Sequence, residues 1–273
     1  MSNNTVRILS GIVLMILVAG CINYGQTSTL IGIGVIGPLI IDEIITNFYS
    51  QPRTSKRYVF AQVFYIVGYY FFNFLQISQS SFSFWISAGV VLDLLLLGYL
   101  FLVYKKSDAL IKVFKMTSWG VGLTILIPLL SLSYILHFPQ WRLILVALLI
   151  LNFSVDTFAY FTGKKFGKHK LWEAVSPKKT IEGAIGGVLS SVILTCLYWN
   201  HFVSAVTPYT AIIFFIIACF SQVGDLVQSK LKRQFDIKDS STLIPGHGGV
   251  YDRVDSLLFV APFFAFYLMA TLR

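Results

Sequence analysis

Acidic, basic and glycine residues are concentrated in one 35-residue segment, residues 221–255, of an otherwise apolar chain. The segment contains five aspartates, five lysines or arginines, one histidine and a Gly-Gly pair. Apolar runs flank it on both sides, at Ala211–Phe220 and Leu257–Leu272. A hydrophobic chain that keeps one such segment is expected to handle a charged ligand there.

The first group of candidate residues follows the apolar run at 211–220. If a helix continues beyond this run, Ser221, Asp225, Ser229, Lys232 and Arg233 share one of its faces. A carboxylate near the edge of an apolar span is costly unless it is paired with a cation or bound to a metal. Asp225 is therefore either a metal ligand or one half of an ion pair with Lys232 or Arg233.

The second group is the glycine-rich sequence PGHGG, residues 245–249, and the two acids that follow it. This sequence cannot continue a helix, and its glycines leave backbone N–H groups open to phosphate oxygens. Asp252 and Asp255 are three residues apart and share a face at the start of the next helix. Two carboxylates at this spacing can gather a hard divalent cation. The alternative for either one is a helix N-cap.

A third group lies upstream, around residues 156–183. Asp156 stands within an apolar run, which indicates a functional site or an interhelical hydrogen bond. Ser176 and Pro177 are typical of a helix N-cap and first helical residue, which would place Lys178 and Lys179 at an anion-binding helix start. Gly183 and Gly187 form a small-xxx-small pair that predicts close helix packing. Three other acids lie in apolar runs and have no assignable role: Asp42, Glu43 and Asp93.

These groups describe a site with acids for a divalent cation, several fixed cations, and glycine backbone for phosphates. Metal and positive charge that offset developing negative charge are the chemistry of phosphoryl or nucleotidyl transfer. The residues alone identify neither the nucleotide nor the acceptor.

The elements that must position these residues are membrane-spanning helices. The chain of 273 residues is 56% hydrophobic and only 12% charged, with a mean hydropathy of +0.75, which indicates a polytopic membrane protein. We predict an all-α fold in a single membrane domain, 1–273, with N-terminal spans to residue 140 and catalytic spans and loops over 141–273. The first span is expected to be retained rather than cleaved. The nine predicted spans are Ile8–Tyr24, Leu30–Phe48, Tyr58–Ile77, Phe82–Tyr104, Thr117–His137, Trp141–Thr162, Ile181–Trp199, Ala211–Val227 and Leu257–Leu272.

The basic residues predict the orientation of these spans. Nine alternating spans place 19 of the 21 lysines and arginines on one side and only Arg142 and Arg273 on the other. The positive-inside rule then predicts a cytoplasmic N-terminus, a candidate site that faces the cytoplasm, and an external C-terminus. In loops that lack acids and glycines, the same cations are expected to contact anionic lipid headgroups.

The candidate segments resemble the signature of the CDP-diacylglycerol synthases (phosphatidate cytidylyltransferases). The similarity covers roughly the C-terminal 45% of the chain, and the N-terminal part matches only as a set of spans. One departure is Gln228, which stands where bacterial members commonly have glutamate. The matching segments are Ser229-x-x-Lys232-Arg233, Lys238-Asp239, residues 245–249 and Asp252-Arg253-x-Asp255, with Asp156-x-Phe158-Ala159-Tyr160 and Ser176-Pro177-Lys178-Lys179-Thr180-x-Glu182-Gly183 upstream.

The resemblance implies the reaction of CTP with phosphatidate to give CDP-diacylglycerol and pyrophosphate, in a Mg²⁺-dependent homodimer embedded in membrane lipid. It implies no nucleic-acid partner. It places the metal on Asp225 and Asp252, and a second, monovalent cation such as K⁺ is compatible with that centre. The catalytic residues that it implies are Lys232, Arg233, Asp239, His247, Arg253 and Asp255. The substrate-binding residues that it implies are Asp156, Ser176, Lys178, Lys179, Ser229, Lys238, Gly248 and Gly249.

The chemistry of this reaction fits the residues. The phosphate of phosphatidate is already anionic at neutral pH and needs no general base, so we interpret His247 as a hydrogen-bonding residue of the glycine-rich turn. A CTP-dependent polyprenol or phytol kinase is the main alternative, and it would need a base to deprotonate the lipid alcohol. A transporter would spread charged residues through several spans and show repeat symmetry. Here the polar motifs gather on one face and no repeat is visible.

Overall fold

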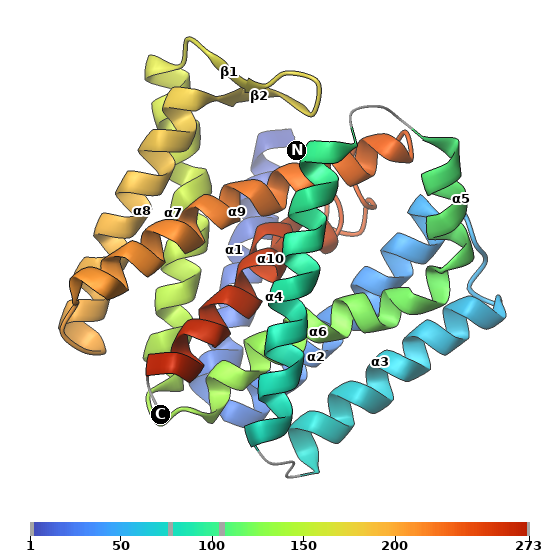
Figure 1. Cartoon of the computed structure of the whole chain (residues 1–273), viewed down its shortest axis with the longest axis horizontal. Coiled ribbons are helices and arrows are strands. Elements are labelled where there is room, and N and C mark those ends of the chain that lie inside the picture. The colour runs from blue at the N-terminus through green and yellow to red at the C-terminus, as the bar shows by residue number, and fades with distance from the viewer. Residues whose placement is uncertain (1–2, 76–78, 104–106, 272–273) are drawn as a thin grey trace.

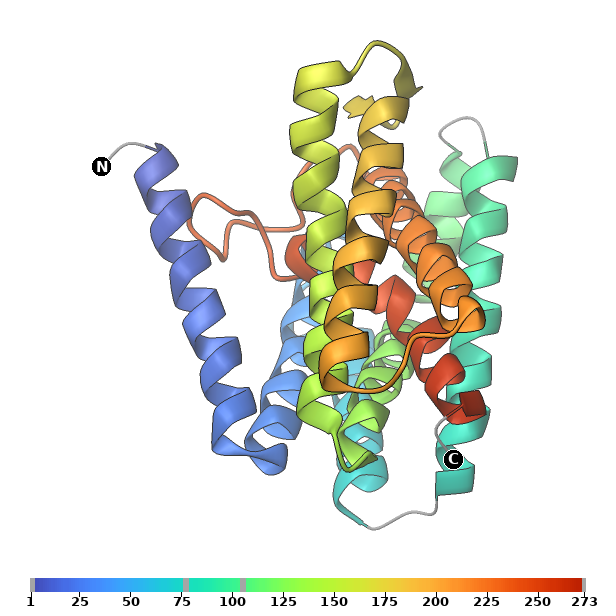
Figure 2. The same ribbon diagram turned by 90° about the vertical axis from the view of Figure 1, so that its left-hand side faces the viewer.

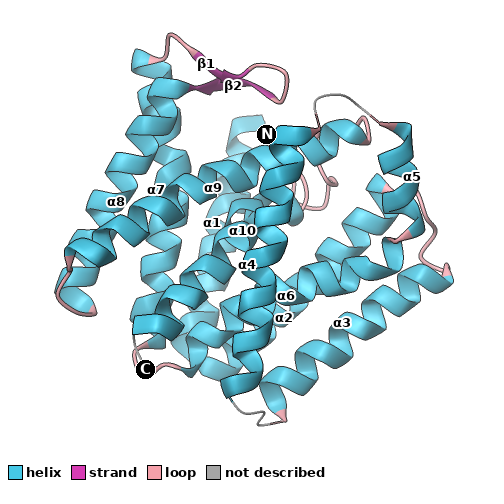
Figure 3. Ribbon diagram, viewed as in Figure 1, coloured by secondary structure: helices cyan, strands magenta, loops and turns pink. Residues whose placement is uncertain are grey.

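A computed structural model of the chain describes residues 3–75, 79–103 and 107–271. These residues form a helical bundle with one short β-hairpin (Figures 1 and 3). The α-helices are α1 (Asn3–Tyr24), α2 (Gln26–Glu43), α3 (Lys56–Phe74), α4 (Gln79–Leu102), α5 (Asp108–Met116), α6 (Val121–Tyr134), α7 (Trp141–Phe166), α8 (Ile181–Phe202), α9 (Pro208–Gln234) and α10 (Tyr251–Thr271). A π-helix, η1 (Ile44–Phe48), extends α2, and the 3₁₀ turns η2 (Ser118–Gly120) and η3 (Ile135–His137) flank α6. The hairpin pairs β1 (Lys170–Trp172) with β2 (Ser176–Thr180).

Each of the nine predicted spans coincides with a helix, which confirms an all-α multi-pass membrane protein. Within the described residues, eight helices are long and apolar enough to cross a membrane. Helix α3 occupies the place of the third predicted span but is less apolar, because it carries four tyrosines together with Gln62 and Asn73. Seven residues used in the predicted spans or the charge count lie outside the described residues: Gln76, Ile77, Tyr104, Lys105, Lys106, Leu272 and Arg273.

The polar elements gather at one end of the bundle. The start of α1, the β1–β2 hairpin and the loop between α9 and α10 lie at this end, and α10 runs to the opposite end (Figures 1 and 2). Helices α6 and α10 are the most enclosed of the spans, because α2, α3 and α4 pack around α6 while α4, α6 and α9 pack around α10. The candidate residues of α10 therefore belong to one of the two most enclosed helices, and those of α9 belong to a helix that packs against it.

Helices α7 and α8 form a closely packed antiparallel pair (Figure 1). A Cβ added at Gly183 would come within 2.8 Å of the Ala159 carbonyl oxygen, and one at Gly187 within 2.5 Å of the Val155 carbonyl oxygen. No larger side chain fits at either position without separating the helices. The predicted small-xxx-small packing is confirmed.

The predicted start of α8 was wrong. Ser176 is not an N-cap, because residues 176–180 pair with β1 as an antiparallel strand. The N-cap is Thr180, whose Oγ accepts a hydrogen bond from the backbone N–H of Gly183 at 3.1 Å. Lys178 and Lys179 consequently lie on the strand that leads into α8, with their side chains on opposite sides of the backbone.

Candidate functional site

The first feature of the site is an ion pair between Asp225 of α9 and Lys179 of β2. Lys179 Nζ lies 2.6 Å from Asp225 Oδ2, and both side chains are about a quarter exposed. Ser229, one turn further along α9, donates its hydroxyl to Asp225 Oδ1 at 3.2 Å. The alternative in which Asp225 pairs with Lys232 or Arg233 was wrong, since its direct cationic partner comes from the hairpin.

Lys232 instead pairs with Asp252 at the start of α10. Lys232 Nζ lies 2.7 Å from Asp252 Oδ1, with side-chain exposures of only 11% and 5%. The other oxygen, Oδ2, accepts from the N–H of Ser240 at 2.7 Å, the hydroxyl of Ser240 at 3.0 Å and the N–H of Gly249 at 2.9 Å. The α9–α10 loop therefore folds back and joins the end of α9 to the start of α10.

Two glycines of the loop permit this close packing. Gly248 has a φ of +85°, and a Cβ there would also lie 2.7 Å from Asp252 Oδ2. A Cβ at Gly249 would collide with the hydroxyl of Ser240. The N–H of Gly249 was predicted to face a phosphate, but it donates to Asp252 and is occupied while that contact lasts.

The loop borders a polar cavity of about 550 Å³. Its lining includes four predicted site residues: Asp239, His247, Gly248 and Arg253. The rest comes from the same loop and from α1: Arg7, Ser241, Thr242, Ile244 and Gly246. His247 Nδ1 lies 2.7 Å from the hydroxyl of Ser10. Burial and the positive charges of Arg253 and Arg7 lower the pKa of His247 below its ordinary 6.5. A neutral, hydrogen-bonded imidazole is the favoured state.

Three helices bring carboxylates together beside the Lys179 ion pair. Asp156 of α7 lies within electrostatic range of Lys179, Asp225 and Arg253, and Asp255 of α10 lies within range of Asp225 and Asp156. Asp255 Oδ1 accepts from the backbone N–H of Ser256 at 2.8 Å. The upstream motif around Asp156 therefore lies beside the segment of residues 221–255, which contains Asp225 and Asp255.

A buried polar chain fixes the same three helices below the carboxylates. Ser221 of α9 donates to Asn152 Oδ1 of α7 at 3.0 Å, and Asn152 Nδ2 donates to the hydroxyl of Ser256 on α10 at 3.1 Å. All three side chains are fully or almost fully buried. Hydrogen bonds of this kind set the rotation of each helix, and so determine which of its residues face the site.

Glu43 organises the loop from a distant helix, and its role was not found from the sequence. Its Oε1 accepts from the hydroxyl of Ser241 at 2.7 Å and the N–H of Val250 at 2.8 Å. Its Oε2 accepts from the hydroxyl of Ser240 at 2.8 Å and the N–H of Tyr251 at 2.9 Å. Glu43 thus caps the N-terminus of α10 and holds the start of the loop. The signal that could have found it is an acid within an apolar run.

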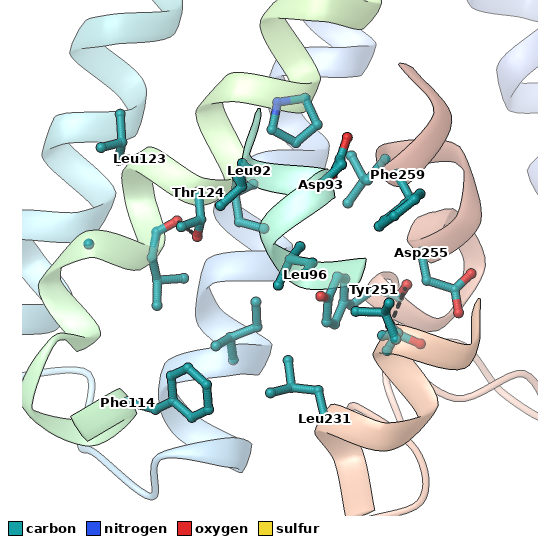
Figure 4. Close-up of a pocket in the computed structure, with 18 of the residues that line it drawn as sticks. Leu92, Asp93, Leu96, Phe114, Leu123, Thr124, Leu231, Tyr251, Asp255 and Phe259 are labelled. Carbon is teal, nitrogen blue, oxygen red and sulfur yellow. Dashed lines mark hydrogen bonds between the residues drawn. The ribbon is translucent and has the colours of Figure 1, made fainter. Parts of the chain in front are cut away.

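An apolar cavity of about 470 Å³ adjoins the carboxylates (Figure 4). Asp255, Tyr251 and Asp93 of α4 are among the residues that line it, together with leucine and phenylalanine side chains. Gln228 donates to the carbonyl of Tyr251 at 3.0 Å. Asp93 Oδ2 and Gln228 Oε1 are buried without a hydrogen-bond partner among the described residues. The cavity is mainly hydrophobic, with a few buried polar acceptors next to the site.

Four predicted residues lie away from these contacts. Arg233 donates to the carbonyl of Ile237 at 3.2 Å and is exposed at the end of its own helix. Lys178 and Lys238 are exposed and have no side-chain hydrogen bond or ion pair within the described part of the chain. Ser176 lies in β2, opposite Trp172.

The donor set suits Mg²⁺ in type, because this cation prefers carboxylate oxygens and usually keeps several waters. Among the described residues, no three His, Cys, Asp or Glu side chains form a metal-binding group by themselves. Asp252 receives four donors, three on Oδ2 and one on Oδ1, so only Oδ1 keeps a lone pair for a cation. Asp225 receives two and retains free lone pairs toward a cation. The residues fit a magnesium ion held by one or two carboxylates, with Asp225 the more available.

The chain is similar to several bacterial proteins named phosphatidate cytidylyltransferase. It is 45% identical to that of Bacillus subtilis (strain 168) over 123 residues, which are 44% of this chain and 45% of the relative. It is 50% identical to that of Staphylococcus aureus (strain COL) over 121 residues, 44% of this chain and 46% of the relative. Each match therefore spans about half the length of the relative. The cytidylyltransferase family matches residues 5–271, almost the whole sequence, and the chain belongs to this family.

Proposed function

We propose that this protein is a phosphatidate cytidylyltransferase, which transfers CMP from CTP to phosphatidate and releases pyrophosphate. The observation that carries the proposal is the pair of lysine–carboxylate contacts, Lys179–Asp225 and Lys232–Asp252, beside a polar cavity with two arginines. Family membership and the names of the similar proteins support it.

The two lysines are suited to hold the substrate phosphates. Both substrates are anionic, so their approach is opposed by charge repulsion that fixed cations must offset. Lys179 and Lys232 are held in place by their ion pairs with Asp225 and Asp252. Arg253 lines the adjoining polar cavity, where it can receive further phosphate oxygens. These three cations are the candidates for orienting the triphosphate against the lipid phosphate.

We further propose that the reaction requires Mg²⁺. Asp225 would hold the ion, with Asp252 joining if Lys232 leaves it, and a monovalent cation such as K⁺ could share the same carboxylates. When bound, the metal supplies positive charge to the phosphates of CTP. No general base is needed because the attacking phosphate is already ionised, which agrees with a neutral His247 tied to Ser10.

The apolar cavity offers a place for the hydrocarbon part of the acceptor. It adjoins Asp255 and is lined mainly by leucine, phenylalanine and valine side chains. A lipid phosphate beside Asp225 could thus keep its acyl chains in a hydrophobic environment. The 19-to-2 distribution of basic residues supports an orientation with the loop end of the bundle in the cytoplasm and the C-terminus outside. A homodimer is the assembly that we expect.

The test is an assay of the purified protein with radiolabelled CTP, phosphatidate and Mg²⁺. CDP-diacylglycerol and pyrophosphate should form in equal amounts, and chelation of the metal should stop the reaction reversibly. Asp225→Asn, prepared in the same detergent, is the matched inactive control. Release of CDP with phosphorylation of a lipid alcohol would replace the proposal with a kinase, and absence of any CTP turnover would reject it.

A further inference from the structure

Helix α1 touches the functional loop with two side chains. It packs along α2 and is otherwise largely exposed, with Ile8 63% and Met15 67% accessible. In Figure 2 its N-terminal end stands apart from the bundle and the α9–α10 loop reaches across to it. Arg7 Nε donates to the carbonyl of Gly246 at 2.7 Å, and the hydroxyl of Ser10 lies 3.0 Å from the carbonyl oxygen of Pro245. The contact is therefore specific to the glycine-rich turn.

Arg7 retains most of its hydrogen-bonding capacity. Of its five N–H groups, the one on Nε is engaged, and the other four have no partner among the described residues. The side chain lines the polar cavity together with Arg253 and His247. Both arginines are close enough to His247 for their charges to add to the effect of burial on its pKa. The guanidinium groups of Arg7 and Arg253 thus both contribute positive charge to the polar cavity.

The charge of this cavity favours an anion. Asp239 is its only acidic side chain among the described residues, whereas two arginines line it. Its volume of about 550 Å³ is in the range of small-molecule sites. Guanidinium groups bind phosphate oxygens through paired, charge-assisted hydrogen bonds. A phosphate group is the ligand chemistry that this lining fits best.

We propose that Arg7 is a phosphate-binding residue, so that the first membrane helix completes the polar cavity that Arg253 also lines. The identity of the phosphate as part of CTP or of phosphatidate rests on the proposed function, but the anion site itself does not. The competing explanation is that Arg7 only ties α1 to the loop, through the carbonyl of Gly246.

Arg142 provides a matched control for that competing explanation. Its Nε donates to the carbonyl of Ile22 at 3.0 Å, so it ties α7 to the other end of α1 with the same kind of bond. It does not line the polar cavity. Arg142→Gln therefore removes an arginine tie to α1 without removing a cation from the cavity.

The experiment measures binding of inorganic pyrophosphate by calorimetry to the full-length protein in detergent. Arg7→Gln should weaken binding roughly 10- to 100-fold, the usual effect of one charged hydrogen-bonding group. Arg7→Lys, which keeps the charge, should fall between wild type and Arg7→Gln, and Arg142→Gln should stay within about twofold of wild type. Equal losses in Arg7→Gln and Arg142→Gln, or no loss in either Arg7 variant, would overturn the proposal.

Steady-state kinetics then distinguish the source of the phosphate. A raised KM for CTP in Arg7→Gln, with an unchanged KM for phosphatidate, assigns the site to the nucleotide, and the reverse assigns it to the lipid. Pyrophosphate binding that depends on Arg7 in a protein without cytidylyl transfer would retain the anion site and reject the proposed function. Normal turnover with pyrophosphate binding that is indifferent to Arg7 would reject the anion site alone.

Discussion

Glu43→Gln is the substitution for which the structure gives the sharpest expectation. Glu43 is 2% exposed and accepts four hydrogen bonds, one backbone N–H and one serine hydroxyl on each oxygen. Glutamine keeps the shape of the side chain but turns one acceptor into a donor. Whichever oxygen is replaced, the N–H of Val250 or of Tyr251 then faces another donor.

The magnitude follows from these contacts. A serine hydroxyl can rotate to another acceptor, and the Ser240 hydroxyl already lies 3.0 Å from Asp252 Oδ2. A backbone N–H at a helix start cannot rotate, so its hydrogen bond to the carboxylate is lost and the group is left buried and unsatisfied. These two effects together amount to roughly 3–5 kcal/mol. For a chain of this size, the melting temperature should fall by about 6–20 °C.

The assay is thermal unfolding of the purified protein in detergent, followed by tryptophan fluorescence. Amide hydrogen exchange should rise in residues 240–251, which Glu43 holds, before it rises in the rest of α10. The control is Asp42→Asn, which removes an adjacent carboxylate that is paired with an exposed Arg53. Arg53 is 71% exposed, and Asn keeps one oxygen that can accept from Tyr58 or Arg53, so this variant should shift the melting temperature by less than about 6 °C. A Glu43→Gln variant as stable as Asp42→Asn would refute the reasoning.

Three other predictions concern the site itself. Asp225→Asn and Asp252→Asn should each abolish product formation. Only Asp252→Asn should also lower the melting temperature markedly, because it leaves the buried Lys232 unpaired. Mg²⁺-dependent turnover near that of the wild type in either variant would show that the residue is not a metal ligand. Lys179→Ala should lower kcat/KM roughly 10- to 100-fold. Lys178→Ala should change it less than about threefold, because Lys178 is exposed whereas Lys179 contacts Asp225. Equal effects of the two substitutions would contradict this difference between the lysines. His247 should titrate below pH 6.5 by NMR. The folded state disfavours protonation of His247, so its contribution to stability should be constant above pH 6.5 and should decline as the pH falls through the lowered pKa. A titration midpoint at or above pH 6.5 would contradict the prediction.

The spans were predictable because hydrophobic length dominates their placement. Helix α9 also continues to Gln234 with its polar face intact, as the spacing of its polar residues indicated. Helix α10 begins at Tyr251, so Asp252 lies in its first turn, as predicted, ahead of the apolar span that was expected from Leu257. Its first N–H groups are satisfied by Glu43, a residue of α2, and a cap supplied from so far along the chain leaves no local signal. The same holds for Ser176, whose local cap signature was overridden by pairing with β1.

The residue types in the sequence predicted the chemistry of the site, but they did not predict which residues contact one another. Carboxylates and lysines of the signature segment were predicted to act together, and Asp252 and Lys232 do so. The partner of Asp225 could not be read from helix periodicity, because Lys179 reaches it from a hairpin that folds over the end of α9. Arg7 was counted only as an orientation signal, since nothing in a single basic residue before an apolar run indicates the loop that it meets.

The two lysine–carboxylate pairs have a consequence for how such a site can stay assembled in a membrane protein. Lys179 and Lys232 are the candidates for holding phosphates, and Asp225 and Asp252 are the candidates for holding a metal, yet in the structure each lysine neutralises one carboxylate. A buried charge without a partner is strongly destabilising, so the pairs keep the substrate-free site stable. Under the proposed function, a magnesium nucleotide brings both signs of charge at once. Lys179 and Lys232 would then pair with its phosphates, and Asp225 and Asp252 would hold its cation, so that every charged group would keep a partner. Asp225 accepts from two donors and Asp252 from four, so the Lys179–Asp225 pair is the one that such an exchange would open first.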